Sequence, residues 1–341
     1  MNGYERINAA LSGKKPDKIP VILHNFMMAA HEYGATMEEF RNSPRVIADS
    51  FIKSVEKYQL DAVLVDIDTV TLAGAAGVPV DFPVHEAARS HHGCLDTLED
   101  LRTLKPVKLE DYKYVQVWLE SVRMLKDHFK NEIFIRGNCD QAPFSLASMI
   151  RGSQNWMLDL MVAEESLISG LLEYCTEITT GFIRLMAQTG ADMVSNGDSV
   201  SGPEMISPEM YAKYALPYET KVVEVAHSLG KPYVLHICGN TDSILDKMLL
   251  TGADGLELDY KTDAVKARDL MKDKTTFIGN IDPSGVLALG SVENVQSKTR
   301  ELLSIFSGVN RFILNSGCAL PFTTPSENIR MMVETARIPN P

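Results

Sequence analysis

The sequence predicts an α/β fold, a single-domain (β/α)8 TIM barrel over residues 1–341. Eight short apolar runs end in polar residues, and most successive runs are separated by a helical segment. Their nearly continuous apolar character is typical of parallel strands that are covered on both faces. No Pro/Gly/Ser-rich linker or abrupt change of composition divides the chain, which indicates one domain. A doubly wound sheet is the alternative fold.

The eight runs predict the strands in chain order. They are Pro20–His24, Ala62–Asp68, Ile133–Cys139, Met193–Asp198, Pro232–Cys238, Gly255–Asp259, Thr275–Asp282 and Arg311–Cys318. A helix is expected before them, at residues 1–15. The long segment at about 73–110 is expected to form an insertion over the mouth of the barrel.

Two helix starts can be read from capping residues. Ser207 followed by Pro208 places an N-cap before a proline at the first helical position, and predicts a helix through Tyr211 and Tyr214 toward His227. The sequence Thr-Pro-Ser-Glu at residues 324–327 has the spacing of a capping box. The final helix is therefore expected to begin there.

Composition excludes several kinds of partner. The chain has 33 Lys and Arg residues against 45 Asp and Glu residues, a formal net charge of −12 at pH 7. Because no basic block offers a surface for phosphates, nucleic acid is not an expected partner. No segment approaches the roughly 18 uncharged apolar residues of a membrane span, and the amino terminus lacks the apolar core of a signal peptide. The sequence therefore predicts a cytoplasmic protein without membrane contact.

Five cysteines, an odd number spread over a long chain, argue against a disulfide framework and suit a reducing compartment. Two of them, Cys238 and Cys318, end the fifth and the eighth predicted strands. His236 lies two residues before Cys238, so both side chains point to the same side of a strand. One imidazole and two thiolates form a ligand set suited to Zn²⁺, with a fourth position left for substrate.

Other assignments of these residues remain open from spacing alone. H-x-C is a short pattern, and a buried cysteine usually behaves as a small apolar side chain. Cys139 also ends a strand and is an alternative ligand, whereas Cys175 falls within a helical pattern and is expected in the core. Cys94, beside His91 and His92, could belong to a separate metal site, with a solvated loop as the competing explanation.

Many further polar residues end the predicted strands, where the active site of such a barrel lies. Aspartate and asparagine are also ordinary strand-ending and capping residues, so these positions carry two interpretations. The set is His24, Asn25, Asp66, Asp68, Asn138, Asp140, Asn196, Asp198, His236, Cys238, Glu257, Asp259, Asn280, Asp282, Asn315 and Cys318. Dinucleotide, P-loop, nucleophile-elbow and H-E-x-x-H motifs are absent, which disfavours the enzyme classes that use them.

Three segments carry a family resemblance: Val234–Asp259, Phe277–Ser291 and Asn315–Glu334. The chain resembles the uroporphyrinogen decarboxylase superfamily, and within it the zinc-dependent corrinoid methyltransferase branch that includes the methylcobamide:coenzyme M methyltransferases. The resemblance implies a TIM barrel and zinc held by the histidine and cysteine of H-x-C and by a late cysteine. These positions match His236, Cys238 and Cys318. The decarboxylase branch has an arginine-rich M-R-Q-A-G-R segment after its first strand, but this sequence has HNFMMAAHEYG.

The expected function is therefore zinc-dependent transfer of a methyl group between a small substrate and the cobalt of a corrinoid (cobalamin). The substrate is a methyl ether, such as a phenyl methyl ether, or a thiol such as coenzyme M. No D-x-H-x-x-G sequence for binding the corrinoid occurs in this chain, so a separate corrinoid-binding protein is the expected partner. Departures at HNFMMAAHEYG and GNCDQAP favour a methyl donor as the substrate.

Asp259, Glu257, Asp198 and Asn280 are the candidates for orienting the imidazole or handling protons, with structural capping as the competing role. Two other functions stay as alternatives: a tetrapyrrole lyase of the uroporphyrinogen decarboxylase type, and a non-catalytic partner of a corrinoid protein. The sequence leaves open the direction of methyl transfer, the fourth zinc ligand and whether the chain forms a homodimer.

Overall fold

The computed structural model describes residues 1–338, and the last three residues of the predicted domain lie outside this range. Seven parallel strands form one curled sheet in the order β1-β4-β5-β6-β7-β8-β9. These strands are β1 (Ala62–Val65), β4 (Phe134–Gln141), β5 (Met193–Gly197), β6 (Tyr233–Ile237), β7 (Gly255–Leu258), β8 (Thr276–Ile281) and β9 (Phe312–Ser316). The predicted TIM barrel is confirmed, and every strand of this sheet falls within or next to a predicted run.

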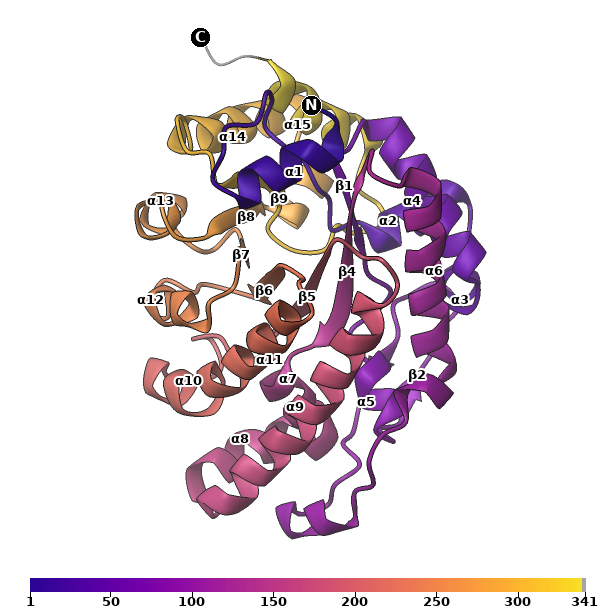
Figure 1. Ribbon diagram of the computed structural model, residues 1–341, viewed down its shortest axis with the longest axis vertical. Coiled ribbons are helices and arrows are strands. Elements are labelled where there is room, and N and C mark those ends of the chain that lie inside the picture. The colour runs from indigo at the N-terminus through magenta and orange to yellow at the C-terminus, as the bar shows by residue number, and fades with distance from the viewer. Residues whose placement is uncertain (339–341) are drawn as a thin grey trace.

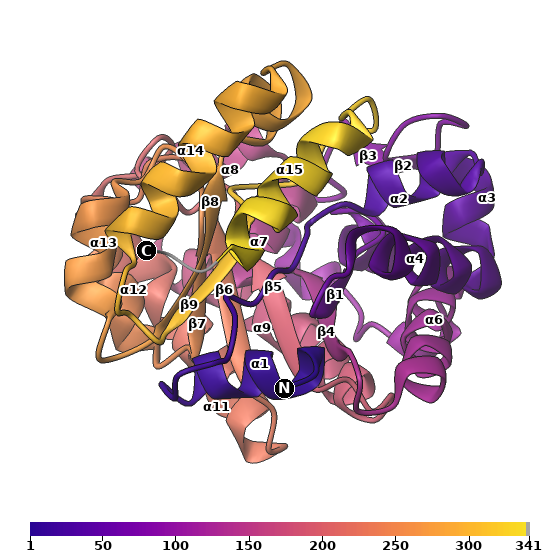
Figure 2. The ribbon, with the colours of Figure 1, turned by 90° about the horizontal axis from the view of Figure 1, so that it is seen from above.

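Helices cover the outside of the sheet, as Figures 1 and 2 show. Those before β5 are α1 (Gly3–Leu11), α2 (Phe26–Tyr33), α3 (Met37–Asn42), α4 (Pro44–Tyr58), α5 (Thr71–Ala75), α6 (Lys113–Phe129), α7 (Pro143–Arg151), α8 (Ser153–Val162) and α9 (Glu165–Ala187). Those after it are α10 (Pro208–Tyr214), α11 (Leu216–Ser228), α12 (Leu245–Met248), α13 (Ala264–Met271), α14 (Val292–Ile305) and α15 (Ser326–Arg337). Within residues 1–338, no helix combines the length and the apolar character that crossing a membrane requires.

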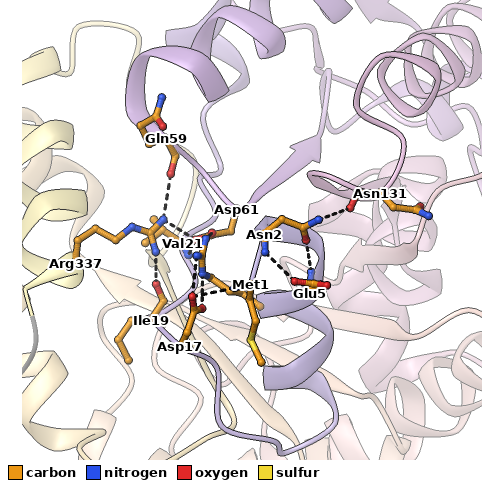
Figure 3. Close-up of polar contacts among 11 residues, drawn as sticks. Met1, Asn2, Glu5, Asp17, Ile19, Val21, Gln59, Asp61, Asn131 and Arg337 are labelled. Carbon is orange, nitrogen blue, oxygen red and sulfur yellow. Dashed lines mark hydrogen bonds and ion pairs between the residues drawn. The ribbon is translucent and has the colours of Figure 1, made fainter.

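The first predicted strand, at residues 20–24, closes the barrel without forming a regular strand. Val21 bridges Leu314 of β9 in parallel, and the amide of Asp61, next to β1, donates to the Val21 carbonyl at 3.0 Å. The Val21 amide donates instead to the Asp61 carboxylate at 2.8 Å, which also binds Arg337 of α15 at 2.6 Å (Figure 3). Pro20 has no amide hydrogen to donate. The eighth position of the barrel is therefore an extended segment with only one bridge.

The predicted amino-terminal helix is α1, which is shorter than residues 1–15. The Asn2 side chain accepts from the Glu5 amide at 2.9 Å, and the Glu5 carboxylate accepts from the Asn2 amide, so a capping box begins the helix. Ile7 and Ala10 of α1 pack on a buried apolar layer inside the barrel, formed by Ile22, Ala62, Leu64, Phe134, Met193, Val234, Ile278 and Ile313. Because α1 covers this end of the barrel, the open end is the one where the strands finish.

Two details of the predicted helices are corrected. Ser207 caps α10 as expected, with its hydroxyl oxygen accepting from the Met210 amide at 3.2 Å. The helix does not continue to His227 unbroken, because it is interrupted at Ala215 before α11, which has a proline in its first turn. The final helix begins at Ser326, but no capping box forms. The Thr324 hydroxyl donates to the Pro321 carbonyl at 2.8 Å instead.

The segment predicted as an insertion follows the carboxyl end of β1. It contains a small antiparallel sheet of β2 (Val80–Asp81) and β3 (Arg89–Ser90) and two short 3₁₀ helices, η1 (Leu98–Thr103) and η2 (Leu109–Asp111). Arg41 of α3 fixes it by donating to the carbonyls of Pro83 at 2.6 Å and Glu86 at 2.5 Å. The segment is thus attached beside α3, and its covering of the barrel mouth stays a prediction.

Candidate metal centre

Strand β6 and the loop after β9 bring the three predicted metal ligands together. His236 is buried and Cys238 and Cys318 are half-buried, and their ligand atoms all lie within 4.8 Å of one another. His236 Nε2 is 3.2 Å from Cys238 Sγ. In a tetrahedral zinc site with Zn–N of about 2.0–2.1 Å and Zn–S of about 2.3 Å, this separation is about 3.6 Å. A small adjustment therefore allows the three side chains to hold one ion.

A backbone contact orients the imidazole. His236 lies opposite Glu257 in the β6–β7 register, and its Nδ1 donates to the Glu257 carbonyl at 2.9 Å. This bond leaves Nε2, which faces the two sulfurs, as the nitrogen able to bind a metal. Fixing one ring nitrogen with a carbonyl is what metal-binding histidines in proteins commonly require.

The side chains of the two cysteines form a hydrogen bond with each other. The hydrogen bond with Cys318 lowers the pKa of Cys238, while the same contact, together with burial, raises the pKa of Cys318 to about 12. Cys318 is thus the thiol that donates the hydrogen bond, and the Cys238 sulfur accepts it. Binding of a divalent metal requires cysteine ligands without their protons, which charge neutralisation by the ion favours.

Hydrogen bonds fix the loops that carry the cysteines. The Asp259 carboxylate accepts from the Gly239 amide at 2.9 Å, next to Cys238. Asn280 donates to the Asp259 carbonyl at 3.1 Å, which links the ends of β7 and β8. A side chain on Gly317 would place its Cβ 2.4 Å from the Tyr260 amide nitrogen, so glycine lets the loop before Cys318 approach β7 closely. Asp259 and Asn280 therefore brace the centre, and their role in handling protons stays a prediction.

Beside the centre, a buried ion pair crosses the inside of the barrel. Arg136 of β4 donates to the Glu257 carboxylate and, at 2.9 Å, to the Ser195 hydroxyl. Burial raises the pKa of Glu257, but the charge of Arg136 and the contact with His24 outweigh it and keep this pKa well below its usual value. The lowered pKa makes Glu257 an anion at neutral pH. Its backbone carbonyl binds the imidazole of His236, and its side chain binds Arg136.

His24 faces this ion pair from the first extended segment. Its Nε2 is 2.7 Å from the Asp66 carboxylate, and its Nδ1 is 3.6 Å from Glu257 Oε1. Burial lowers the pKa of His24, but the hydrogen bond with Asp66 and the nearby carboxylate of Glu257 raise it to about 9. At neutral pH His24 is therefore a cation between two carboxylates. Its Nδ1 and Glu257 Oε1 are both buried and make no hydrogen bond within the protein.

This raised pKa predicts a loss of stability at alkaline pH. Folded His24 binds its proton more tightly than unfolded His24, whose pKa is near 6.5, so the stabilisation is complete below about pH 6.5 and is lost as the pH rises through about 9. The shift corresponds to about 3 kcal/mol. Urea unfolding at a fixed zinc concentration should show the wild type losing stability relative to His24→Gln over this range. A difference that stays constant from pH 6 to pH 10 would contradict the assignment.

Asp198, the remaining predicted catalytic residue, has its side chain among helices. Its amide donates to the His236 carbonyl at 2.7 Å, but its carboxylate accepts from the Ser145 amide at 2.7 Å, in α7. Burial raises its pKa to about 6, and the buried Glu219 of α11 lies nearby. The backbone of Asp198 therefore holds β6 at His236, while a catalytic role of its side chain stays a prediction.

The other cysteines lie away from this centre. Cys139 and Cys175 are fully buried in the apolar core, and Cys94 is exposed, with its sulfur 3.9 Å from the Ala76 carbonyl oxygen. Among residues 1–338, the group His236, Cys238 and Cys318 is the one set of three or more His, Cys, Asp or Glu side chains close enough to share an ion. The alternatives with Cys139, or with Cys94 and its neighbouring histidines, do not form such a group.

Arg136 is the residue near the site that the sequence reasoning missed. The signal was present, because an arginine inside the apolar run IFIRGNC must find a charged partner when the strand is buried. His24 and Asp66 are among the polar residues that end predicted strands, and the sequence pattern does not indicate that they pair with each other. Phe134 of β4 faces the inside of the barrel, so alternation along the strand places the side chain of Arg136 inside as well, where it pairs with Glu257.

A parallel barrel with an imidazole and two thiols at the carboxyl ends of its strands defines a TIM-barrel protein with a candidate metal centre. The chain belongs to the uroporphyrinogen decarboxylase (URO-D) family, whose model matches residues 2–338. The resemblance predicted from the sequence is thereby confirmed.

Named relatives come from both branches of the family. The methylcobamide:CoM methyltransferase MtbA of Methanosarcina acetivorans is 35% identical over 70% of this chain and 68% of its own. The methylcobamide:CoM methyltransferase MtaA of Methanosarcina barkeri is 25% identical over 96% of this chain and 95% of its own. The uroporphyrinogen decarboxylase of Geotalea daltonii is 28% identical, over 94% and 95%. A solved methyltransferase from Methanosarcina mazei has the same fold, with a TM-score of 0.86, 24% identity and 98% of each chain covered.

Proposed function

We propose that the protein is a zinc-dependent methyltransferase that moves a methyl group between a small substrate and the cobalt of a corrinoid carried on a separate protein. The observation that carries this proposal is the cluster of His236, Cys238 and Cys318, with ligand atoms within 4.8 Å, in a chain related to methylcobamide:CoM methyltransferases. A substrate thiol or methyl ether would take the fourth position of the centre.

The donor set fits zinc and the reaction. When bound, zinc supplies a Lewis acid that stabilises a thiolate or an alkoxide at neutral pH. His236 is held with Nε2 toward the sulfurs, and Cys238 and Cys318 provide two negative charges that balance those of the ion. His236 is buried and the two cysteines are half-buried, which shields these groups partly from water and strengthens their electrostatic contacts.

Decarboxylation of a porphyrinogen is the weaker candidate. Its polyanionic substrate needs a cluster of free cations, which the acidic chain does not offer at the corresponding position, HNFMMAAHEYG. Arg136, the arginine inside the barrel, is already bound to Glu257. Because the chain is also related to the uroporphyrinogen decarboxylase of Geotalea daltonii, this alternative is tested in a control assay.

A spectroscopic assay tests the proposal. The zinc-loaded protein is mixed with a free or protein-bound corrinoid, and Co(I) and methyl-Co(III) absorbance is followed with methyl ethers, methylamines and thiols. We expect methylation of Co(I) or demethylation of methyl-Co(III) with at least one class, and loss of the reaction after zinc removal. Release of CO₂ from uroporphyrinogen without methyl transfer would favour the lyase. Tight binding of a corrinoid protein without any transfer would favour the non-catalytic partner.

The partner and the setting of the reaction follow from the same proposal. The corrinoid protein would dock at the carboxyl ends of the strands, since α1 covers the other end of the barrel. A cytoplasmic location and a homodimer remain predictions of this function. Chemical crosslinking with a corrinoid protein tests the docking, and sizing of the purified chain tests the homodimer.

A further inference from the structure

Six polar side chains inside the barrel form a closed ring of contacts. In order around the ring they are Arg136, Ser195, Asn138, Asp66, His24 and Glu257. Five of the six contacts are hydrogen bonds or ion pairs of at most 3.2 Å. The sixth is longer, since His24 Nδ1 lies 3.6 Å from Glu257 Oε1 and neither atom has a hydrogen-bond partner within residues 1–338. The contact between His24 and Glu257 is therefore the loosest link of the ring.

The ring and the metal centre lie on the same side of the buried apolar layer. Ile22 and Val234 belong to that layer, and His24 and His236 follow them by two positions. Because side chains two residues apart in an extended chain point to the same side, both histidines face the inside of the barrel, one step nearer to the carboxyl ends of the strands. The Glu257 carbonyl accepts from His236 Nδ1 at 2.9 Å. One end of the loosest link thus holds the imidazole of the centre.

The other end of the link holds the segment that carries Cys318. The His24 amide donates to the Asn315 side-chain oxygen at 3.2 Å, and the His24 carbonyl accepts from the Leu320 amide at 2.8 Å. Asn315 precedes Cys318 by three residues and Leu320 follows it by two, so the two contacts fix this segment on both sides of the cysteine. His24 therefore connects the loop of Cys318 to Glu257.

We propose that His24 is a positioning residue of the metal centre, which sets the distance between the Cys318 sulfur and the His236 imidazole. This inference rests on the proposed function and adds a residue to its metal site. The His24 side chain lies between the carboxylates of Asp66 and Glu257. Their attraction draws the first extended segment, and with it the loop of Cys318, toward β7. A neutral side chain of similar size would leave that loop without this attraction.

Titration of the metal-free protein with Co²⁺ tests the proposal, because the absorption bands of bound Co²⁺ depend on the geometry of its ligands. His24→Leu keeps the approximate size of the side chain but removes its charge and its hydrogen-bond donors. We expect this variant to bind Co²⁺ at least about tenfold more weakly and with altered bands, since loss of the contacts around metal ligands typically costs about 10–100-fold in affinity. His24→Lys returns a cation between Asp66 and Glu257 and should recover most of the affinity.

The matched control is His227→Leu, which should bind Co²⁺ like the wild type, because His227 is exposed and pairs with Asp254 at 2.8 Å outside the ring. A folded His24→Leu protein with the affinity and the spectrum of the wild type would overturn the inference, and so would equal weakening in His24→Leu and His24→Lys. If His24→Leu does not fold, His24→Gln, which keeps one donor, is held to the same criterion. If methyl transfer fails with every substrate while Co²⁺ binding follows the expected pattern, the proposed function is wrong and the role of His24 stands.

Discussion

A Cys318→Ala variant is expected to lose its zinc and its methyl transfer together. Cys318 supplies one of the three candidate ligand atoms, which lie within 4.8 Å of one another. Zinc in small structural sites is bound with roughly 10–16 kcal/mol, so one ligand of four corresponds to about 3 kcal/mol, or about 100-fold in affinity. With only His236 and Cys238 left, the activity should fall to background. Zinc per chain, measured by plasma mass spectrometry after dialysis, checks the first effect.

Cys94→Ala is the matched control, because Cys94 is an exposed thiol outside the cluster. It should keep both the zinc content and the activity of the wild type. Circular dichroism should show the same fold for both variants, since Cys318 lies in a loop after β9 and packs no core. A Cys318→Ala protein that retains stoichiometric zinc and normal transfer would remove the cluster from the reaction.

The metal cluster could be predicted from the sequence because its geometry is mostly local. His236 lies on β6 and Cys238 directly follows that strand, two residues later, so the alternation of an extended chain predicts that they point to one side. Cys318 joins them because parallel strands finish at one end of a barrel. The orientation of the imidazole could not be predicted, since it depends on the carbonyl of Glu257 on the neighbouring strand.

Like the metal cluster, the fold could be predicted wherever the local sequence pattern determines the structure. The seven strands of the parallel sheet are short, mostly apolar runs, and their order in the sheet follows the chain. The first run was also apolar, yet its amide at Val21 binds the Asp61 carboxylate, 40 residues away. The insertion is attached through the side chain of Arg41, which donates to the carbonyls of Pro83 and Glu86, and no periodicity in residues 73–110 specifies these contacts. Contacts between distant segments are thus what the sequence pattern left undetermined.

The second large effect is expected from Arg136→Met, which leaves the carboxylate of Glu257 buried beside the metal centre without its main partner. Side chains of both residues are almost fully buried, with 2% and 1% exposed. Removing one member of a buried ion pair typically destabilises a protein by about 3–5 kcal/mol, since the remaining charge is left in a medium of low polarity. Urea unfolding followed by far-ultraviolet circular dichroism measures the change. A loss below about 1 kcal/mol would contradict the geometry of the pair.

The double variant Arg136→Met/Glu257→Gln shows what the pair contributes. Replacing a buried ion pair by neutral groups is often close to neutral for stability, so the double variant should recover most of the loss, with a coupling of at least about 2 kcal/mol. Zinc binding should survive, because His236 is oriented by the backbone carbonyl of residue 257 rather than by its side chain. His24, however, loses one of its two carboxylates. A folded, zinc-loaded double variant with slow methyl transfer would therefore indicate that the buried charges serve the reaction, whereas unchanged transfer would limit them to the fold.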